Sequence, residues 1–211
     1  MPRPGSHLVV VALGLAILGA GSSEPGIAAG SDLLPAQALL GAEPPEVVAE
    51  LLEAGSLVLD RPGDLVRAYV VFDRPVDRVY QLLSATSRQA EYRSELASLE
   101  TVARTPDGQI DEHHIRIVFV EVSYRLRYRL DPERRRIVWK LDPDFASPMR
   151  RIEGSWELYE MDPSHTLGRF ATAVDVGDAL PAFLEEAVTR KTLPRTLERC
   201  RRWVNADGEE P

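Results

Sequence analysis

The chain has 211 residues, of which 44% are hydrophobic and 27% are charged, as in an ordinary globular protein with one domain and short additions. Its formal net charge of -8 argues against nucleic-acid binding, which needs a positively charged surface. The single cysteine, Cys200, excludes an internal disulfide and a cysteine metal cluster, so we expect a buried, unreactive thiol. No metal or other cofactor is expected.

The N-terminal residues have the pattern of a signal peptide. Arg3 and His7 precede an unbroken run of apolar or small residues over 8–20. This run is shorter than the ~20 residues that a membrane-spanning helix needs, and small residues suited to cleavage follow it. We therefore expect residues 1–29 to be a signal peptide and the protein to be exported, either periplasmic or secreted. The alternative is an uncleaved signal anchor that tethers the domain to the membrane.

Residues 30–55 are expected to form an N-terminal linker that contains a short helix. The first part of this segment is rich in small residues and proline and shows no periodicity. Residues 45–54 place their apolar side chains on one side of a helix, which Gly55 should end. A short strand is predicted directly afterwards, at 56–59.

A strand followed by a helix is the next predicted unit. Apolar residues alternate over 65–72, which indicates a strand. From Val76 onwards apolar residues recur at the i, i+3, i+4, i+7 spacing of one helical face. A second, less regular helical segment is expected at 87–96.

From residue 99 onwards the sequence predicts a meander of antiparallel strands, because short alternating segments are separated by turn-forming Asp, Pro and Gly. The predicted strands cover 99–104, 110–119, 122–130, 135–141, 149–161 and 166–176. One face of this sheet should lie in water and the other should be covered.

The last apolar-periodic stretch, 180–204, predicts a long amphipathic helix around which the domain, 56–205, is organised. Pro194 lies inside this pattern and should kink or break the helix, because proline lacks an N–H and its ring clashes with the preceding turn. The sheet needs the helix to cover its apolar face, and the helix needs the sheet for the same reason. A polar tail, 206–211, follows.

Two tyrosines and two tryptophans fall on the covered face of the predicted sheet. Tyr124 and Tyr128 alternate with arginines in one strand, and Trp139 and Trp156 take the covered face of the next two. Aromatic rings with a polar tip suit the wall of a mostly apolar pocket. A sheet that curves over one helix often leaves such a cavity, but a filled core in which these rings simply pack fits the pattern equally well.

Residues 118–122 are apolar where the meander should turn, although loops normally lie in water. One hypothesis makes Phe119 and Val120 the lip of the cavity or a transient membrane contact. The alternative is that the strand continues and these residues belong to the core. Outward-facing arginines nearby either attract anionic head groups or form a solvated sheet face. These are Arg125, Arg127, Arg129, Arg134, Arg135 and Arg136.

Signals for catalysis are weak, and no catalytic residue is expected. His113 and His114 are adjacent in a strand, so their side chains point to opposite faces and cannot easily bind one metal together. A surface or strand-end role is expected for both. Asp142 and Asp144 lie in a loop, where a solvated turn is expected and a cation site is the alternative.

Four segments, in their order along 59–204, resemble one known superfamily. They are the strand–proline–helix segment 72–83, the strands 124–128 and 137–139, the Gly-x-Trp-x-Leu strand 154–158, and a terminal helix with an internal Leu-Pro, 180–197. The chain is similar here to the START-like superfamily, the polyketide cyclase/dehydrase and lipid-transport (SRPBCC) group with the helix-grip fold. The resemblance implies an α+β fold in which a curved antiparallel sheet of about seven strands wraps round a long C-terminal helix, with a hydrophobic ligand cavity between them.

The fold does not fix the function, because binders, transporters and enzymes share it. We expect an exported protein that binds or transports an apolar small molecule such as a lipid, an isoprenoid or a polyketide. The aromatic side chains expected to line its cavity are Tyr124, Tyr128, Trp139, Trp156, Phe170 and Phe183. One alternative is a cyclase- or dehydratase-type enzyme in which Tyr124 or Tyr128 handles a proton in the same pocket. Another is a protein-interaction module without a cavity.

Overall fold

A single antiparallel sheet forms the body of the domain. The computed structural model describes residues 34–59, 65–117, 120–176 and 192–209. Within these residues eight strands pair in the order β1-β2-β8-β7-β6-β5-β4-β3, one strand more than the resemblance implies. The strands are β1 (Ser56–Leu59), β2 (Leu65–Phe72), β3 (Leu96–Thr105), β4 (Gly108–Ile117), β5 (Val120–Asp131), β6 (Arg136–Leu141), β7 (Arg151–Asp162) and β8 (His165–Asp175). The predicted α+β fold is confirmed.

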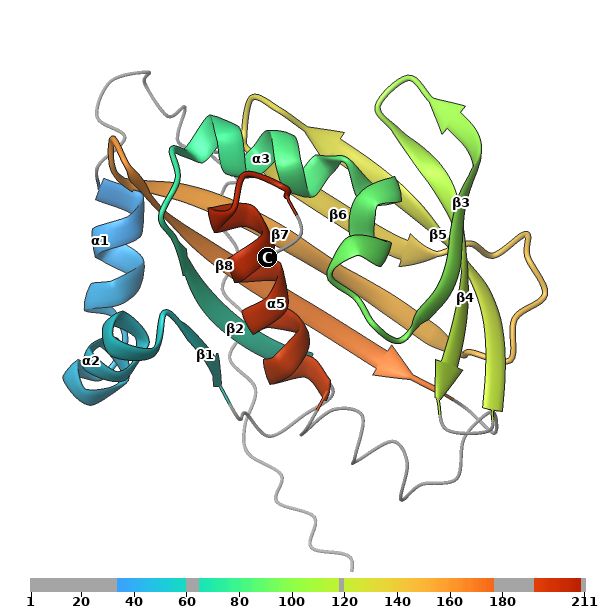
Figure 1. Cartoon of the computed structure of the whole chain (residues 1–211), viewed down its shortest axis with the longest axis horizontal. Coiled ribbons are helices and arrows are strands. Elements are labelled where there is room, and N and C mark those ends of the chain that lie inside the picture. The colour runs from blue at the N-terminus through green and yellow to red at the C-terminus, as the bar shows by residue number, and fades with distance from the viewer. Residues whose placement is uncertain (1–33, 60–64, 118–119, 177–191, 210–211) are drawn as a thin grey trace, which may run out of the picture. The chain divides into compact units, whose positions relative to one another are not determined.

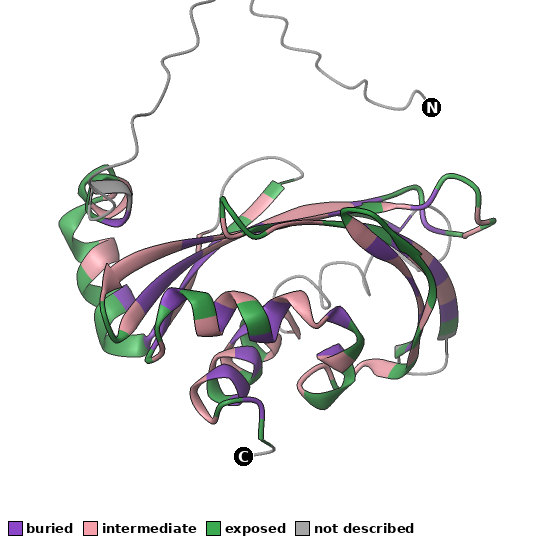
Figure 2. Cartoon of the chain, turned by 90° about the horizontal axis from the view of Figure 1, so that it is seen from above, coloured by how far each residue is buried: buried purple, intermediate pink, exposed green. Residues whose placement is uncertain are grey.

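The sheet is curved, and three helical segments lie on its concave side (Figures 1 and 2). They are α3 (Val76–Ser84), the 3-10 helix η1 (Thr86–Glu91) and α5 (Leu193–Asn205). The helix predicted at 87–96 is thus a shorter 3-10 turn, and β3 already begins at Leu96. The two sheet edges differ, because β1 has four residues whereas β3 has ten and carries register shifts at 96/98 and 101/103.

Of the predicted C-terminal helix, 180–204, the structure describes only the second half. The described helix α5 begins at Leu193 and places Pro194 in its first turn. A proline there removes no hydrogen bond of the helix, because the first N–H groups have no acceptor within it. The part predicted over 180–191 lies outside the described residues. The tail after α5 packs on the domain, since Arg78 binds the carboxylate of Asp207 at 2.6 Å.

The inner core forms between the concave face of the sheet, α3 and α5. Both helices bury one face, as their periodicity predicts. The buried residues of the two helices are Val76, Val79, Leu82, Leu83, Leu197, Cys200, Trp203 and Val204. Trp203 is the largest of them and is 1% exposed. Its indole N–H donates to Glu91 at 2.9 Å, which ties α5 to η1.

A second apolar cluster covers part of the outer face of the sheet, which was expected to lie in water. It joins Ala36 of α1 (Leu34–Gly41) and Leu51 of α2 (Pro45–Ala54) to Tyr69, Val71 and Leu167 of the sheet. The segment expected to be a linker therefore contains an additional helix, α1, and packs on β1, β2, β7 and β8. Gly55 ends α2 in the left-handed conformation, with φ 75°, as its position predicts.

The expected signal peptide, 1–29, lies outside the described residues and stays a prediction. None of the helices in the described part of the chain has the length and apolarity that a bilayer-spanning helix requires.

Gly154 on β7 makes room for a tryptophan on the neighbouring strand. Gly154 pairs with Trp139 of β6, and a Cβ atom at this position would overlap the Trp139 ring and the carbonyl oxygen of Ala171. The absence of a side chain therefore lets the indole lie flat against the inner face of the sheet.

We expect Gly154→Ala to lower the free energy of unfolding by about 1–3 kcal/mol, because the added methyl group must displace either the Trp139 ring or the backbone of β8. Gly41→Ala is the matched control, since nothing lies within 4 Å of a Cβ atom there, and its change should stay within about 0.5 kcal/mol. Equilibrium unfolding in urea measures both. Equal stability of the two variants would show that Trp139 does not depend on this glycine.

Candidate functional site: a cavity under the concave sheet

A cavity of about 710 Å³ lies between the inner face of the sheet, the segment from η1 to β3, and α5. The strands β4 to β8 form its roof, and Leu193, Thr196, Leu197 and Cys200 form the α5 side. The domain is therefore not the solid-core module that the sequence left open. Pockets for small molecules commonly have volumes of roughly 300–1,000 Å³, so this cavity is of ligand size.

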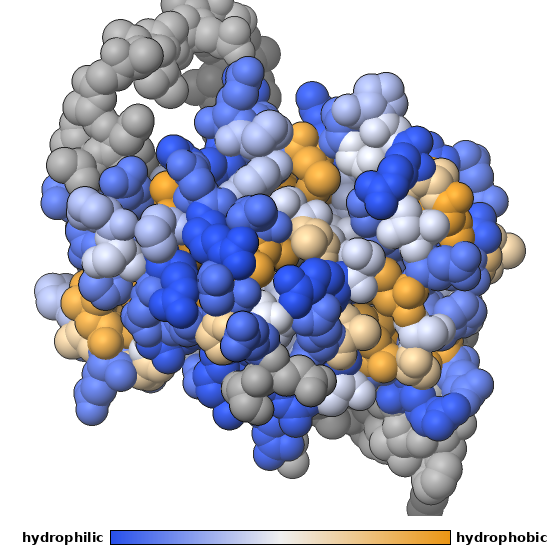
Figure 3. Space-filling view, turned by 45° about the horizontal axis from the view of Figure 1, so that its top comes forward, coloured by the Kyte–Doolittle hydropathy of each residue, from blue (hydrophilic) through white to orange (hydrophobic). Residues whose placement is uncertain are grey.

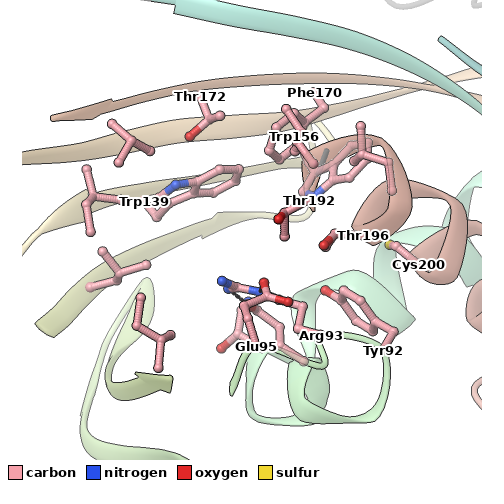
Figure 4. A pocket seen from close by; sticks show the side chains of 18 of the residues that line it. Tyr92, Arg93, Glu95, Trp139, Trp156, Phe170, Thr172, Thr192, Thr196 and Cys200 are labelled. Atoms are coloured by element: carbon pink, nitrogen blue, oxygen red, sulfur yellow. Dashed lines mark hydrogen bonds and ion pairs between the residues drawn. The ribbon is translucent and has the colours of Figure 1, made fainter. Parts of the chain in front are cut away.

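Aromatic rings from three adjacent strands line one wall of the cavity (Figure 4). The ring centroid of Phe170 lies 5.7 Å from that of Trp139 and 4.9 Å from that of Trp156. Trp156 and Phe170 are register partners on β7 and β8. These tilted rings present a flat, mostly apolar surface to the interior.

Five of the six aromatic residues expected to line a cavity are placed on its wall: Tyr124, Tyr128, Trp139, Trp156 and Phe170. Their role in ligand binding stays a prediction. Phe183 and Phe119 lie outside the described residues. Val120 begins β5, but its side chain is not described, so the proposed lip of the cavity also stays a prediction.

An ion pair faces the aromatic wall from the segment that joins η1 to β3. The Nε atom of Arg93 donates to the carboxylate of Glu95 at 2.8 Å, and its Nη1 atom donates to the side-chain oxygen of Gln89 at 2.8 Å. The second carboxylate oxygen of Glu95 is buried and has no hydrogen-bond partner in the described part of the chain. Figure 4 shows Arg93 and Glu95 across the cavity from Trp139. Neither residue is predicted from the sequence, because charged residues in an irregular segment carry no periodic signal for burial.

The hydrogen-bonded chain continues from Gln89 to Tyr128 and His113. The Nε2 atom of Gln89 donates to the Tyr128 hydroxyl at 3.1 Å, and that hydroxyl lies 3.4 Å from Nε2 of His113. His113 also stacks on Tyr124, with centroids 5.0 Å apart and planes at 9°. It is 0% exposed, so the expected surface or strand-end role is wrong for His113. His114 does point to the opposite face, where it meets Glu112 at 3.1 Å.

Burial sets the protonation of these groups. Burial lowers the pKa of His113 well below its usual range, and the neighbouring positive charge of Arg93 lowers it further. Burial raises the pKa of the Tyr128 phenol above its usual value. Burial likewise raises the pKa of the Cys200 thiol to about 12, which agrees with the expected unreactive thiol. At neutral pH the cavity wall therefore holds the neutral phenol of Tyr128 and the Arg93–Glu95 ion pair, and the neutral imidazole of His113 packs against the two wall tyrosines.

Other polar groups singled out by the sequence are already paired. Arg127 binds Asp142 at 2.7 Å and also binds Asp144. Asp142 is 4% exposed, so the expected solvated turn is wrong for Asp142, whereas Asp144 lies in an exposed turn as expected. The remaining arginines of the outward stripe each bind an acidic residue as well: Arg125, Arg129, Arg134, Arg135 and Arg136. The described residues contain no cluster of three or more His, Cys, Asp or Glu able to hold a metal.

A neutral, buried His113 makes the domain sensitive to acid. The pKa of His113 is lower in the folded than in the unfolded protein. Below about pH 6.5 its imidazole therefore binds a proton in the unfolded chain but stays neutral in the folded one. Stability should fall with decreasing pH by up to about 1.4 kcal/mol per pH unit from this group. We expect His113→Phe to flatten this loss between about pH 7 and about pH 5 in thermal or urea unfolding. His114→Gln should keep the loss, and an unchanged slope in His113→Phe would assign it to other groups.

The fold agrees with those of several solved proteins. A protein from Thermus thermophilus is 21% identical, with a TM-score of 0.59 over 69% of this chain and 99% of its own. The Zhui aromatase/cyclase from Streptomyces sp. R1128 is 20% identical, with a TM-score of 0.55 over 68% and 97%. A STAR-related lipid transfer protein from Xanthomonas axonopodis is 15% identical, with a TM-score of 0.54 over 71% and 98%. At these identities the likeness shows the fold alone.

Sequence comparison gives the family. A comparison with curated proteins found no match to this chain. The family described as polyketide cyclase / dehydrase and lipid transport matches over residues 65–202, from β2 into α5, which is well over half of the chain. The matched range contains every strand of the sheet except β1, together with the ion pair and the aromatic wall described above. The expected resemblance is thereby confirmed, and this chain belongs to the polyketide cyclase/dehydrase and lipid-transport family of the START-like superfamily.

Proposed function

We propose that this protein binds an apolar small molecule in the cavity and carries it, and that it does so as an exported protein. A lipid, an isoprenoid or a polyketide fits this class. The observation that carries the proposal is the cavity of about 710 Å³ whose wall is formed by Trp139, Trp156 and Phe170. Membership of a family described by cyclase, dehydrase and lipid-transport activities supports it.

Apolar burial supplies the binding energy in this proposal. A ligand that buries roughly 400 Å² of apolar surface gains about 10 kcal/mol at about 25 cal/mol per Å², before the costs of binding are subtracted. Only the part of this gain that exceeds the costs of binding appears as affinity. The face of the protein seen in Figure 3 supports the cavity as the binding place, because apolar residues appear there as separate patches among hydrophilic ones.

The polar groups of the cavity give the ligand an orientation. Arg93 and Glu95 lie opposite the aromatic wall (Figure 4), and Gln89 and Tyr128 extend the polar region. A flat apolar body against Trp139, with a hydroxyl or similar polar group toward Glu95, satisfies both sides. A purely aliphatic ligand would leave the free carboxylate oxygen of Glu95 unpaired, which costs free energy in a dry cavity.

A second candidate function is a cyclase- or dehydratase-type reaction in the same cavity. The observation that favours it is the Tyr128 hydroxyl, which lines the cavity and lies between Gln89 and His113. Because burial raises its pKa, the phenol would act as a proton donor rather than a base.

The carrier proposal predicts that filling the cavity removes binding. Val174 of β8 lines the cavity and is 43% exposed, so Val174→Trp can place its indole in the free space. Displacing two or three buried methylene groups of a ligand, at roughly 0.8 kcal/mol each, should weaken binding about 15- to 60-fold. Titration with the neutral apolar dye Nile red measures the affinity, and native mass spectrometry after purification measures any bound cargo.

Val102→Trp is the matched control. Val102 lies on the edge strand β3, is 38% exposed and does not line the cavity, so the same substitution should leave dye affinity and cargo unchanged. Equal affinity of both variants and the wild type, with circular dichroism showing folded protein, would refute binding in this cavity.

Tyr128→Phe separates the two candidates, because it removes only the hydroxyl. A carrier should keep its cargo stoichiometry and lose about threefold to tenfold in affinity, as expected for one hydrogen bond. An enzyme should keep affinity and lose turnover by about 100-fold or more. Native mass spectrometry of the extracted cargo, before and after incubation with each variant, records whether its mass changes and thus decides between them.

A further inference from the structure

The outward side of α5 carries a row of arginines. The helix Leu193–Asn205 contains four arginines and one glutamate. Arg201 turns inward and donates to the carbonyl oxygen of Val71 at 2.8 Å. The other three are exposed and follow one another at i, i+4 and i+7, which places them on one side of the helix. We call Arg195, Arg199 and Arg202 the outer arginine face.

The outer arginine face differs from the arginines of the sheet in its pairing. Arg125, Arg127 and Arg129 on β5 are each held by an acidic residue of the sheet or its loops. Arg195 and Arg199, by contrast, have no acidic partner among the residues that the structure describes. Arg202 lies 3.7 Å from Glu198, the one acidic residue of the helix. The arginines of β5, which the sequence suggested as a positive surface, are thus neutralised by acidic partners. On α5, Arg195 and Arg199 are not neutralised in this way by the described residues.

Two acidic residues next to α5, Glu91 and Asp207, are already bound to other groups, whereas the carboxylate of Glu209 in the tail has no partner among the described residues. Glu91 of η1 accepts from Arg88 at 2.7 Å and from the Trp203 indole, and Asp207 binds Arg78 at 2.6 Å. Although the whole chain has a net charge of -8, the Debye length of about 8 Å at physiological salt screens acids farther away. Among the described residues, the unpaired positive charge in front of α5 therefore comes from the outer arginine face, with Glu198 on the same helix and Glu209 shortly after it.

The same helix separates this face from the cavity. Its inward residues Leu193, Thr196, Leu197 and Cys200 line the cavity. On its η1 side a smaller hollow of about 290 Å³ is lined by Arg199, Arg202 and Trp203, together with Tyr92 and Ser94, which also line the main cavity. Figure 2 shows α5 on the concave side of the sheet with exposed residues on its outer side. A surface bound by the outer arginine face would thus lie one helix diameter from the cargo.

We propose that the outer arginine face docks the protein on an anionic phospholipid bilayer, where cargo is exchanged. The exchange rests on the proposed carrier function; the docking itself does not. A row of guanidinium groups at helical spacing complements a plane of phosphate head groups, and each arginine can bind a phosphate with two parallel hydrogen bonds. Docking through three arginines without a buried apolar anchor is reversible, as delivery requires.

The test compares Arg195→Gln/Arg199→Gln with the wild type in vesicle co-sedimentation. The vesicles contain phosphatidylcholine with one third phosphatidylglycerol, or phosphatidylcholine alone. Each arginine near an anionic bilayer raises the partition coefficient about fivefold, so the double variant should lose about 25-fold on anionic vesicles. Wild-type binding should fall steeply between about 0.05 M and about 0.5 M sodium chloride and be weak on phosphatidylcholine alone.

Arg67→Gln/Arg104→Gln is the control, with the same change in net charge. Arg67 on β2 and Arg104 on β3 are also exposed and without an acidic partner among the described residues. This variant should bind anionic vesicles as the wild type does. An equal loss in both double variants would reduce the effect to net charge and overturn the assignment to α5. If the wild-type protein does not co-sediment with anionic vesicles, the docking proposal itself is refuted.

Nile red titration of the same proteins separates this inference from the carrier proposal. The arginine variants should take up the dye normally, because the substituted side chains lie outside the cavity wall or, for Arg199, on the smaller hollow. Wild-type protein that takes up dye but binds no vesicle refutes the docking and leaves the carrier. Wild-type protein that binds vesicles through the outer arginine face but holds neither dye nor cargo refutes the carrier and leaves the docking.

Discussion

The contact between α5 and the concave sheet is the constraint from which the other features follow. An antiparallel sheet with one apolar face must cover that face, and here a helix of 13 residues does so with Leu197, Trp203 and Val204. The helix is narrower than the curved sheet, so it covers the sheet only in part. η1 and α3 cover more of it, and Trp203 fastens α5 to η1 through Glu91. The space left between them is the cavity, which is thus a consequence of sheet curvature and helix width rather than of missing side chains.

The polar groups around this cavity show how a buried site can remain stable without a bound partner. Arg93 is balanced by Glu95, and Gln89 links that pair to Tyr128. Each bond offsets the cost of removing a polar group from water, which is several kcal/mol for an unpaired charge in a dry interior. Two buried side-chain atoms in the described part of the chain are the exceptions: the second carboxylate oxygen of Glu95, on the cavity wall, and Nδ1 of His113, which does not line the cavity. A cavity with a nearly satisfied wall and one free acceptor favours ligands that bring a donor to that position.

Alternation along the strands was enough to predict much of the fold and one wall of the site. The period of two put Tyr124, Tyr128 and Trp139 on one face, and the structure places all three on the cavity wall. Arg93 and His113 could not be predicted in this way, because burial of a polar residue depends on partners brought close only by the fold. Helix α1 was missed because its apolar residues, of which Ala36, Leu39 and Leu40 contact the outer-face cluster, are not concentrated on one side of the helix. Within the described residues Pro194 lies in the first turn of α5, a position that tolerates proline better than a helix interior does.

The unequal edges of the sheet bear on how copies of the protein stay apart at high concentration. An open sheet offers unpaired N–H and C=O groups at both rims, and a long flat rim is a template for fibre growth. Here one rim is the four-residue β1, and the other, β3, is interrupted by two register shifts. Such irregularities twist a strand and break the regular spacing that a second chain would need. A domain built this way keeps an open sheet while offering, at either rim, little surface on which copies of it could polymerise.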